Sequence, residues 1–249
     1  MRISLLTIFP DFFGPALDEG MIRLAREKGQ LEVGIVPLRD FTDDAHRSTD
    51  DYPFGGGVGM IMKIEPIDRA LQSLAAGEKG ARPAGTRVAL FSPQGRAFTQ
   101  DLALEYAKLD HLVLVSGRYK GVDERVSERL VDEELSLGDF VLSGGEPAAL
   151  CVVDAVARLL PGVVGYFDSV EGYSFHSGLL DSAYYTRPAE YRGWTVPEAL
   201  LSGHHAQIAR LRREESLRRT LERRPELLET AELSAGDERF LKRRGWKGR

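Results

Sequence analysis

The stretch from Ser136 to Pro147, SLGDFVLSGGEP, contains residue types that a small-molecule site needs. Its apolar run Phe140–Leu142 is predicted to be a buried strand, with Gly138 before it and Gly144-Gly145 after it. Glycines beside a strand let the main chain approach a ligand closely and adopt positive φ angles. The pattern indicates a ligand-binding edge of an α/β sheet, although such glycines often do no more than turn the chain.

Two other turns have a similar composition. The turn Ser92–Gly95 follows the strand pattern RVALFS, and the turn Ser116–Tyr119 ends the strand pattern HLVLVSGRY. Ligands of parallel sheets bind beyond the carboxyl ends of the strands, where all three turns are expected. The turns therefore predict one pocket. Because it has few fixed charges, it suits a neutral or zwitterionic nucleotide-like ligand better than a triphosphate.

Several other kinds of site lack support in the sequence. The glycines within residues 55–59 are not followed by Gly-Lys-Ser/Thr, and no G-x-G-x-x-G opens a helix, so neither a P-loop nor a dinucleotide fingerprint is predicted. The G-x-S-x-G motif of serine hydrolases is also missing. A lone cysteine and scattered histidines predict no metal site. Cys151 is expected to be a core residue on the apolar face of a helix.

The composition is that of a folded protein, with 249 residues of which 43% are hydrophobic. Residues 191–249 contain 14 Lys/Arg against 9 Asp/Glu, a net +5, within a chain whose net charge is −5. A basic tail on an acidic body favours a polyanionic partner; a solvated helix surface is the plain alternative. The single cysteine, the lack of a signal-peptide pattern and the lack of any apolar run of ~18 residues predict a cytoplasmic protein without a membrane partner.

Strand and helix patterns alternate through the first two thirds of the chain. Strands are expected at Arg2–Phe9 and Leu31–Leu38, and helices near residues 65–76 and in VDERVSERLV after Gly121. This alternation predicts an α/β fold whose parallel sheet is covered on both faces. After Leu160 the periodicity is lost, which indicates a linker, and helical patterns resume beyond Pro197.

Nine motifs occur in order along nearly the whole chain: MRISLLTIFPDFF, PFGGGVGM, SPQGR, SGRYKGVDER, LGDFVLSGGE, PGVVG, SFHSGLLD, YYTRP and PEALLSGHHAQI. Together they resemble the bacterial tRNA (guanine-N1)-methyltransferases of the SPOUT superfamily. The resemblance implies that S-adenosylmethionine donates a methyl group to N1 of the guanosine just 3′ of the anticodon of tRNA. It also implies a homodimer with active sites between the subunits, and no DNA partner.

The resemblance further implies a parallel-sheet SPOUT fold with a deep trefoil knot, plus a small all-helical C-terminal domain. Residues 1–165 would form the knotted domain that binds S-adenosylmethionine, residues 166–190 a flexible linker, and residues 191–249 the basic tRNA-binding domain. The expected donor-binding residues are Ser92, Pro93, Gly117, Arg118, Tyr119, Leu137, Gly138, Asp139, Phe140, Val141, Leu142, Gly144 and Gly145.

The catalytic residues follow from the same resemblance and from the reaction. N1 of guanine carries a proton at neutral pH, so a general base is useful, and an arginine can stabilise the negative charge that develops on O6. Arg158 matches the arginine of the family, with an i,i+4 ion pair to Asp154 as the structural alternative. Asp181 matches a family aspartate that can contact the guanine.

Two positions depart from the family pattern. Tyr173 stands where the family has its catalytic aspartate, and a phenol with a pKa of ~10 is a poor base. Our hypothesis is that Glu171 is the base, with Asp168 as the second candidate. Lys120 stands where many members have a glutamate associated with magnesium, so a magnesium requirement is doubtful; Lys120 could instead bind the donor carboxylate or be an exposed lysine.

The arginines of the C-terminal helix are expected to bind tRNA by neutralising phosphates. Two other classes of protein remain open from the residues alone: a non-catalytic RNA-binding protein with a vestigial pocket, and a dinucleotide-dependent oxidoreductase. The predicted RNA-binding residues are Arg210, Arg212, Arg213, Arg218 and Arg219.

Overall fold

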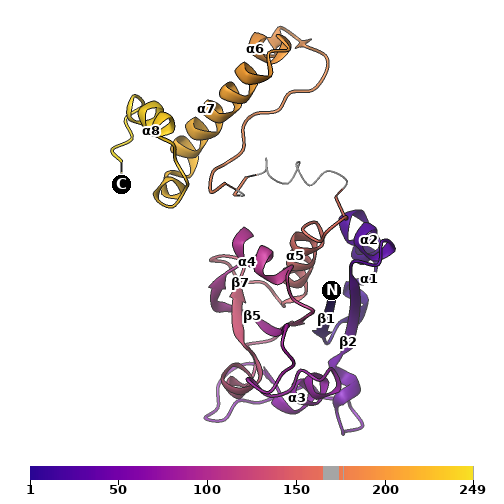
Figure 1. Cartoon of the computed structure of the whole chain (residues 1–249). Helices are drawn as coiled ribbons and strands as arrows, with labels where there is room; N and C mark the ends of the chain where they lie inside the picture. The colour runs from indigo at the N-terminus through magenta and orange to yellow at the C-terminus, as the bar shows by residue number, and fades with distance from the viewer. Residues whose placement is uncertain (165–173, 176, 249) are drawn as a thin grey trace. The chain divides into compact units, whose positions relative to one another are not determined.

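A computed structural model describes residues 1–164, 174–175 and 177–248 of the chain (Figure 1). The chain folds into two compact units, Met1–Gly165 and Tyr166–Arg249. Each unit has its own hydrophobic core. Within the described residues, none of the helices has the length and apolar composition that crossing a membrane requires.

The first unit is built on a five-stranded sheet in which every pair of neighbouring strands is parallel. The strand order is β2-β1-β6-β5-β7. Residues 3–7 of β1 and all residues of β6 are buried, as expected for central strands covered on both faces. The predicted α/β class with a parallel sheet is confirmed. The strands are β1 (Arg2–Thr7), β2 (Glu32–Pro37), β5 (Thr86–Ala97), β6 (His111–Val115) and β7 (Glu133–Ser136).

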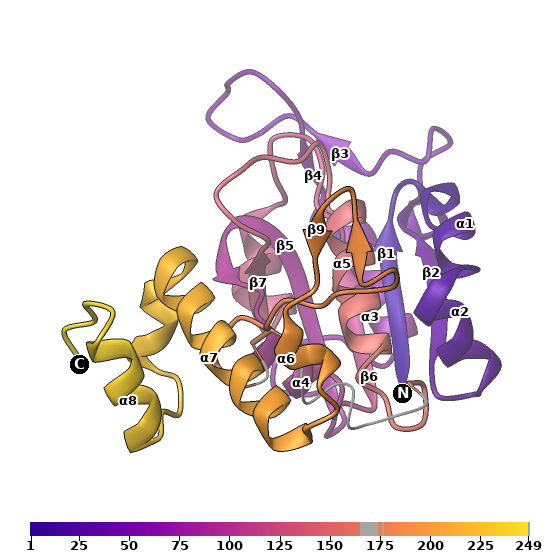
Figure 2. The same cartoon turned by 90° about the horizontal axis from the view of Figure 1, so that it is seen from above.

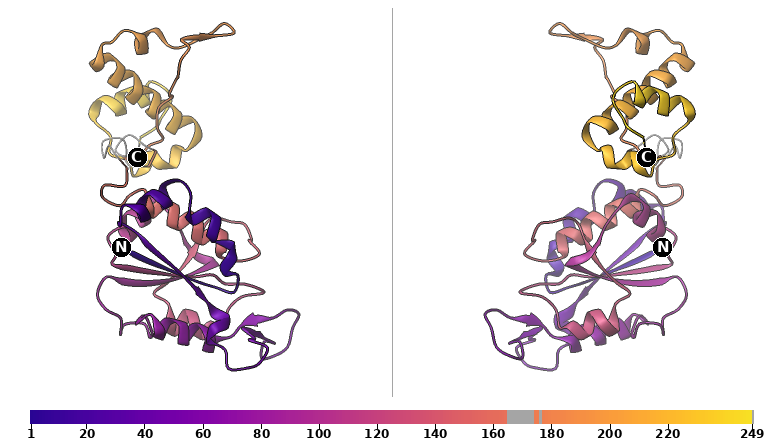
Figure 3. Two further views of the ribbon diagram at one scale, coloured as in Figure 1. Left: turned by 90° about the vertical axis from the view of Figure 1, so that its right-hand side faces the viewer. Right: turned by 90° about the vertical axis from the view of Figure 1, so that its left-hand side faces the viewer.

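Helices cover both faces of this sheet (Figure 3). The last helix, α5, packs against α2, α4 and β1, whereas α3 packs against the 3-10 turn η2 (Leu38–Phe41) and the π-helical turn η3 (Val126–Leu130). The core under α3 contains Ile67 and Leu71, which meet Val88 and Val113 of the sheet. The helices are α1 (Gly14–Leu17), α2 (Gly20–Glu27), α3 (Ile64–Ser73), α4 (Gln100–Tyr106) and α5 (Glu146–Ala157), and a 3-10 turn, η1 (Pro10–Phe12), precedes α1.

A small hairpin carries the glycine-rich loop. Its strands, β3 (Asp50–Asp51) and β4 (Ile61–Met62), pair antiparallel, and the loop between them extends from the sheet (Figure 2). The Phe54 and Val58 side chains of this loop are fully or almost fully exposed. Pro53, Phe54 and Gly56 of this loop line one cavity together with residues 90–94 of β5 and residues 117–122 after β6.

The strand predicted at Phe140–Leu142 is wrong. These residues lie in a loop, and their side chains are 55%, 85% and 40% exposed. The edge position beside β5 is filled by β7, and Gly138, with φ of +142°, then turns the chain away from the sheet. An apolar run next to glycines was therefore mistaken for a strand, and the more polar run Glu133–Ser136 is the strand instead.

Three smaller expectations also differ from the structure. The predicted turn Ser92–Gly95 lies inside β5, as an irregularity between Phe91 and Arg96. Of the predicted helix VDERVSERLV, the residues from Glu124 to Leu130 are helical, and Val126–Leu130 among them form one π-helical turn. Cys151 is exposed rather than part of the core, because the buried face of α5 is formed by its valines and alanines instead.

The second unit consists mainly of helices (Figure 1). Its core joins Leu179 to Leu217 of α7 and to Phe240 and Leu241 of α8, so the segment around Leu179 packs on these helices. α8 begins with a capping box between Ser234 and Asp237, which satisfies its first amide groups. The elements are the hairpin β8 (Glu190–Tyr191) and β9 (Trp194–Thr195), α6 (Glu198–Leu201), α7 (His205–Arg223), the 3-10 turn η5 (Pro225–Glu229) and α8 (Ala235–Lys242).

Candidate active site

A cavity of about 570 Å³ lies beside residues 90–94 in the irregular part of β5 and at the carboxyl ends of β6 and β7, a volume typical of small-ligand pockets. We call it the sheet-edge pocket. It is bounded by the segments Leu90–Gln94, Gly117–Val122 and Glu134–Gly138, by Phe140–Gly145, and by the loop that carries Phe54. All three turns singled out in the sequence therefore contribute to one cavity.

The structure brings together nearly all of the residues predicted to bind the donor. Asp139 is the exception, because it belongs to the loop after β7 without lining the cavity. The residues that line it are Ser92, Pro93, Gly117, Arg118, Tyr119, Leu137, Gly138, Phe140, Val141, Leu142, Gly144 and Gly145.

Glycines allow two walls of the pocket to touch through their main chains. The Gly145 amide donates to the Gly117 carbonyl at 3.0 Å, and Arg118 pairs with Gly144 in an isolated antiparallel bridge. A Cβ on Gly145 would lie 2.8 Å from Cα of Ser116, closer than two non-bonded carbon atoms can approach. Only glycine therefore permits this approach between the turn after β6 and the start of α5.

A buried ion pair stands behind this contact. Nε of Arg118 donates to Oε2 of Glu146 at 3.3 Å, and the Thr7 hydroxyl donates to Oε1 at 2.7 Å. Glu146 is fully buried. The Arg118 guanidinium also lies over the Phe9 ring, 4.4 Å from its centroid, so two contacts fix its plane.

Tyr119 has a strained backbone at the rim of the pocket. Its φ is +61°, a conformation that costs energy for a bulky residue and is concentrated at functional sites. Partial burial, followed by the charge and hydrogen bond of Asp50, raises the pKa of the Tyr119 phenol. The phenol therefore stays protonated at neutral pH and connects the pocket to the β3–β4 hairpin.

Lys120 adds a positive charge to the same rim. Its amide donates to the Met60 carbonyl at 3.1 Å, and a Cβ on Gly59 would lie 3.6 Å from Cβ of Lys120. The side chain thus runs along the glycine-rich loop while it lines the pocket. Within the described residues, no group of three or more His, Cys, Asp or Glu side chains is arranged to hold a metal ion.

The pocket also has acidic residues that were not predicted from the sequence. Glu124, Ser127 and Glu134 line it, and the Ser127 hydroxyl donates to Oε1 of Glu134 at 2.6 Å. Glu134 was overlooked because β7 was not recognised as a strand. A strand at this place would have put Glu134 at the same sheet edge as the glycine turns.

The predicted catalytic residues are distributed over the chain. Arg158 is half-buried and follows α5 directly, so it lies at the opposite end of this helix from Gly145. Asp181 belongs to the second unit, where its Oδ1 accepts hydrogen bonds from the Ser182 amide at 2.6 Å and from the Tyr184 hydroxyl at 3.1 Å. Glu171, Asp168 and Tyr173 lie outside the described residues.

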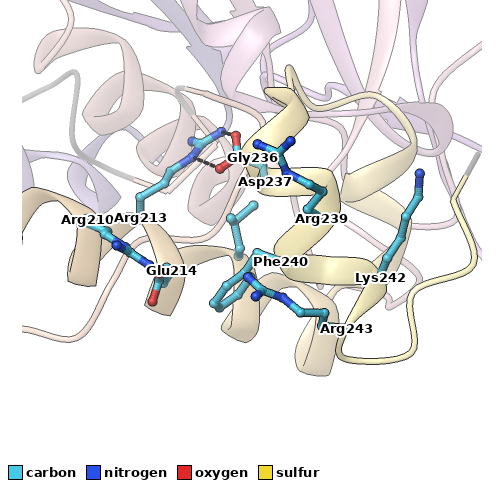
Figure 4. A pocket seen from close by; sticks show the side chains of 10 residues that line it. Arg210, Arg213, Glu214, Gly236, Asp237, Arg239, Phe240, Lys242 and Arg243 are labelled. Atoms are coloured by element: carbon cyan, nitrogen blue, oxygen red, sulfur yellow. Dashed lines mark hydrogen bonds and ion pairs between the residues drawn. The ribbon is translucent and has the colours of Figure 1, made fainter.

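A second cavity, of about 640 Å³, lies between α7 and α8 (Figure 4). Its floor includes Leu217 and Phe240, and charged side chains surround it. We call it the α7–α8 cavity. The charged residues that line it are Arg210, Arg213, Glu214, Asp237, Arg239, Lys242 and Arg243.

Most of the arginines predicted to bind RNA are already paired with carboxylates. Arg213 donates to both oxygens of Asp237, at 3.3 and 2.9 Å, which ties α7 to the start of α8. Arg212 instead lies over the Tyr184 ring, 5.4 Å from its centroid. The remaining pairs are Arg210 with Glu214, Arg218 with Glu215 and Glu222, and Arg219 with Glu215.

Arg239 and Arg243, which were not among the predicted RNA-binding residues, also line the α7–α8 cavity. Within the part of the chain that the structure describes, neither guanidinium has a carboxylate partner. Both residues come after the long arginine-rich helix, in a short segment whose role the sequence pattern did not indicate. Figure 4 shows Arg239 and Arg243 on successive turns of the helix end beside Phe240.

Comparisons with known proteins agree with the motifs. The family model described as tRNA (Guanine-1)-methyltransferase TrmD matches residues 1–230. The chain belongs to this family.

Similar proteins match over nearly their whole length. A protein of Koribacter versatilis (strain Ellin345) named tRNA (guanine-N(1)-)-methyltransferase is 50% identical over 257 residues, with 97% of each chain covered. One of the same name from Moorella thermoacetica is 51% identical over 241 residues, covering 97% of this chain and 95% of the relative. The tRNA (guanine-1)-methyltransferase family match includes the sheet-edge pocket and α7, and ends before α8.

Proposed function

We propose that the protein is an enzyme that transfers a methyl group from S-adenosylmethionine to N1 of the guanosine just 3′ of the anticodon in tRNA. Family membership supports the reaction. The observation that carries the proposal is the convergence on one cavity of the three segments that the sequence singled out, all of which lie within the family match. Family membership and the cavity together give less support to a non-catalytic RNA-binding protein or to an oxidoreductase.

The residues of the sheet-edge pocket suit this donor. S-adenosylmethionine has a carboxylate, an ammonium group and a sulfonium, and the pocket offers Arg118 and Lys120 together with Glu124 and Glu134. The glycine turns supply main-chain groups for the adenine and ribose. When bound, the donor supplies an electrophilic methyl group, so the protein must mainly position it and make N1 nucleophilic.

We propose that Arg158 stabilises the charge that develops on guanine O6, since a fixed cation beside a developing oxyanion lowers the barrier. The proton on N1 needs an acceptor. Glu171 is our first candidate and Asp168 the second, and Asp181 is proposed to contact the guanine. Single-turnover methylation by Glu171→Gln and Asp168→Asn tests the base: a loss of about 10²-fold or more identifies it, and wild-type rates for both variants reject the idea.

We also propose that the enzyme works as a homodimer. The pocket is lined by Gly145 and Ala148 at the start of α5, while Arg158 follows its end. A helix rises ~1.5 Å per residue, so about 18 Å separates the two ends of α5. An arginine side chain cannot reach so far, which supports a site completed by Arg158 of a second copy. From the resemblance to the family we also propose that the first unit contains the deep knot of the SPOUT fold and that the protein is cytoplasmic.

For tRNA binding we propose the second unit as the main contact. The arginines of α7, expected from the sequence, form part of this surface, and we add Arg239 and Arg243 because their guanidinium groups have no carboxylate partner within the described chain. Arg210, Arg212, Arg213, Arg218 and Arg219 would contribute mainly by exchanging their present partners for phosphates.

The reaction is tested by transferring a tritiated methyl group to tRNA transcripts that carry G or A just 3′ of the anticodon. The proposal predicts label in the G transcript alone, and equal or no labelling of the two contradicts it. Calorimetric titration with S-adenosylmethionine separates an enzyme from a protein with a vestigial pocket, because the latter would retain tRNA without binding the donor.

A further inference from the structure

Glu146 is the most deeply buried carboxylate among the described residues, with none of its surface exposed. It is the first residue of α5 and lies directly behind the wall of the sheet-edge pocket without lining it. A buried carboxylate is costly unless it is paired and hydrogen-bonded. The groups that donate hydrogen bonds to Glu146 therefore indicate the role of this buried charge.

Each oxygen of Glu146 has one donor from a different segment. Thr7, at the end of β1, donates to Oε1 at 2.7 Å, and Nε of Arg118, after β6, donates to Oε2 at 3.3 Å. Thr7 also accepts the Phe9 amide at 2.9 Å, and the Phe9 ring lies under the Arg118 guanidinium. The carboxylate thus links the two segments that hold Arg118 in place.

Arg118 is the member of this group that lines the pocket. Its Nε donates to Glu146, and the Phe9 ring covers one face of its guanidinium plane. No acceptor for its two terminal nitrogens is found in the described part of the chain. An arginine presents its two remaining N–H edges in a fixed fork, which suits a carboxylate. The carboxylate is the only anionic group of S-adenosylmethionine.

We propose that Glu146 is a positioning residue for the methyl donor: it fixes Arg118 so that the terminal guanidinium nitrogens donate to the donor carboxylate. This inference rests on the proposed function and adds a residue that never touches the donor. Gly144 is part of the same arrangement, since its missing side chain leaves the space that the Arg118–Glu146 pair occupies.

Glu146→Gln tests the inference, because the amide keeps one acceptor and presents an N–H group to one of the two former donors. We expect the Kd for S-adenosylmethionine, measured by calorimetry, to rise about tenfold, while the KM for tRNA is unchanged. Arg118→Lys should have a similar effect because it loses the fork. The double variant should be no weaker than either single variant within about twofold; independent, multiplying losses would overturn the inference.

Asp132→Asn is the matched control. Asp132 pairs with the buried Arg82 and accepts the Val88 amide in the same unit, but does not line the pocket. It should lower the unfolding temperature and leave the donor Kd unchanged. If Glu146→Gln also lowers the unfolding temperature and leaves the donor Kd unchanged, Glu146 is structural only and the inference fails.

A second variant is available if Glu146→Gln does not fold. Glu146→Asp keeps the charge but withdraws it by one methylene, so it should bind the donor more weakly. Wild-type affinity of Glu146→Asp would overturn the inference.

Donor binding by the wild-type protein distinguishes a failure of the proposed function from a failure of the proposed role of Glu146. Wild-type protein that binds no S-adenosylmethionine would overturn the proposed function and this inference with it. Wild-type protein that binds the donor, together with a Glu146→Gln variant of equal affinity, would overturn the inference alone.

Discussion

The sheet-edge pocket and the α7–α8 cavity differ in how their charged side chains are held. In the pocket, glycine turns bring main-chain groups together and one fully buried carboxylate holds one arginine. In the α7–α8 cavity, long side chains form exposed pairs, such as Arg210 with Glu214, on a small apolar floor. The first arrangement suits one small ligand in one orientation, and the second suits an extended polyanion.

Energetics explain the difference. Exposed ion pairs contribute about 0–1 kcal/mol, so an arginine of α7 can exchange a glutamate for a phosphate at little cost. Breaking a buried pair such as Arg118–Glu146 costs about 3–5 kcal/mol, because a charge is left without a partner. Specificity for the donor is therefore expected to reside in fixed geometry, and affinity for RNA in exchangeable charge.

The largest effect is expected at Arg158, which belongs to neither region. Arg158→Ala should lower single-turnover methylation by about 10²–10³-fold, because a fixed cation beside the developing charge is lost, and should leave the Kd values for donor and tRNA unchanged. Arg158→Lys, which keeps the charge, should lose less. A large change in either Kd would mean that binding and chemistry are not separated as proposed.

Mixed dimers sharpen this prediction. Subunits with Arg158→Ala should be rescued in part by subunits with Gly145→Ala, because one of the two sites in the mixed dimer would then have an intact pocket and an intact arginine. Activity that stays at the level of the separate variants would contradict a site shared between subunits.

Gly145→Ala should affect the donor almost as strongly. Its Cβ would lie 2.8 Å from Cα of Ser116, and relief of such overpacking typically costs about 1–3 kcal/mol, so donor affinity should fall up to about 100-fold by calorimetry. Gly34→Ala in β2, where no atom lies within 4 Å of the added Cβ, is the control. Wild-type donor affinity of Gly145→Ala would show that the pocket does not depend on main-chain contact.

Changes in the α7–α8 cavity should weaken the binding of tRNA and leave the binding of the donor unchanged. Changing both Arg239 and Arg243 to alanine should raise the KM for tRNA about tenfold and reduce the slope of log K against log salt by about 1–2. Arg23→Ala is the matched control, since this exposed arginine belongs to α2 of the first unit and pairs with Glu27, and it should change KM less than about twofold. Equal effects of the two changes would show that a general loss of positive charge, and not this cavity, weakens tRNA binding.

A smaller effect concerns pH and the first unit. Burial, and then the charge of Arg2, lowers the pKa of His111 to about 4, and the ring accepts a hydrogen bond from Arg2 while it contacts Ser4. The unfolded chain binds this proton below pH ~6.5, so stability should fall from pH ~6.5 to ~4, by on the order of 2 kcal/mol. Urea unfolding of wild type and His111→Gln at both pH values should show this loss only in wild type; the same loss in both would contradict it.

The smallest expected effect is that of a chelator. Lys120 lines the pocket at the position where the resemblance to the family implies a glutamate associated with magnesium, so we expect methylation rates with EDTA and with added magnesium to agree within about twofold. A large loss with EDTA that magnesium restores would show that metal binding does not depend on a carboxylate at this position.

The sequence predicted the sheet and the pocket better than their details. Buried parallel strands have long apolar runs, and glycines near them mark close approaches, so the three segments that line the pocket could be located without the structure. One of them, residues 92–95, lies inside β5 and not in the turn that was predicted. The strand at β7 was missed because Glu133-Glu134 makes it polar on one side, while Phe140–Leu142 is apolar although exposed. Single-sequence periodicity does not indicate which apolar runs a partner or ligand covers.

The arginine pairs could not be predicted for a different reason. Spacing of three or four residues allows Arg218 to meet Glu215 and Glu222, but many such pairs do not form. The contact of Arg213 with Asp237 depends on how α8 packs on α7, which is a tertiary property. The same holds for Glu146, whose partners Thr7 and Arg118 are distant in sequence.

The most direct test of the account is a crystal structure of the protein with S-adenosylhomocysteine, the product of the donor. We expect this ligand in the sheet-edge pocket, against residues 117–119 and 137–145, with its carboxylate on the Arg118 guanidinium. Density for the ligand at any other place on the chain would contradict the central claim that these main-chain turns hold the methyl donor.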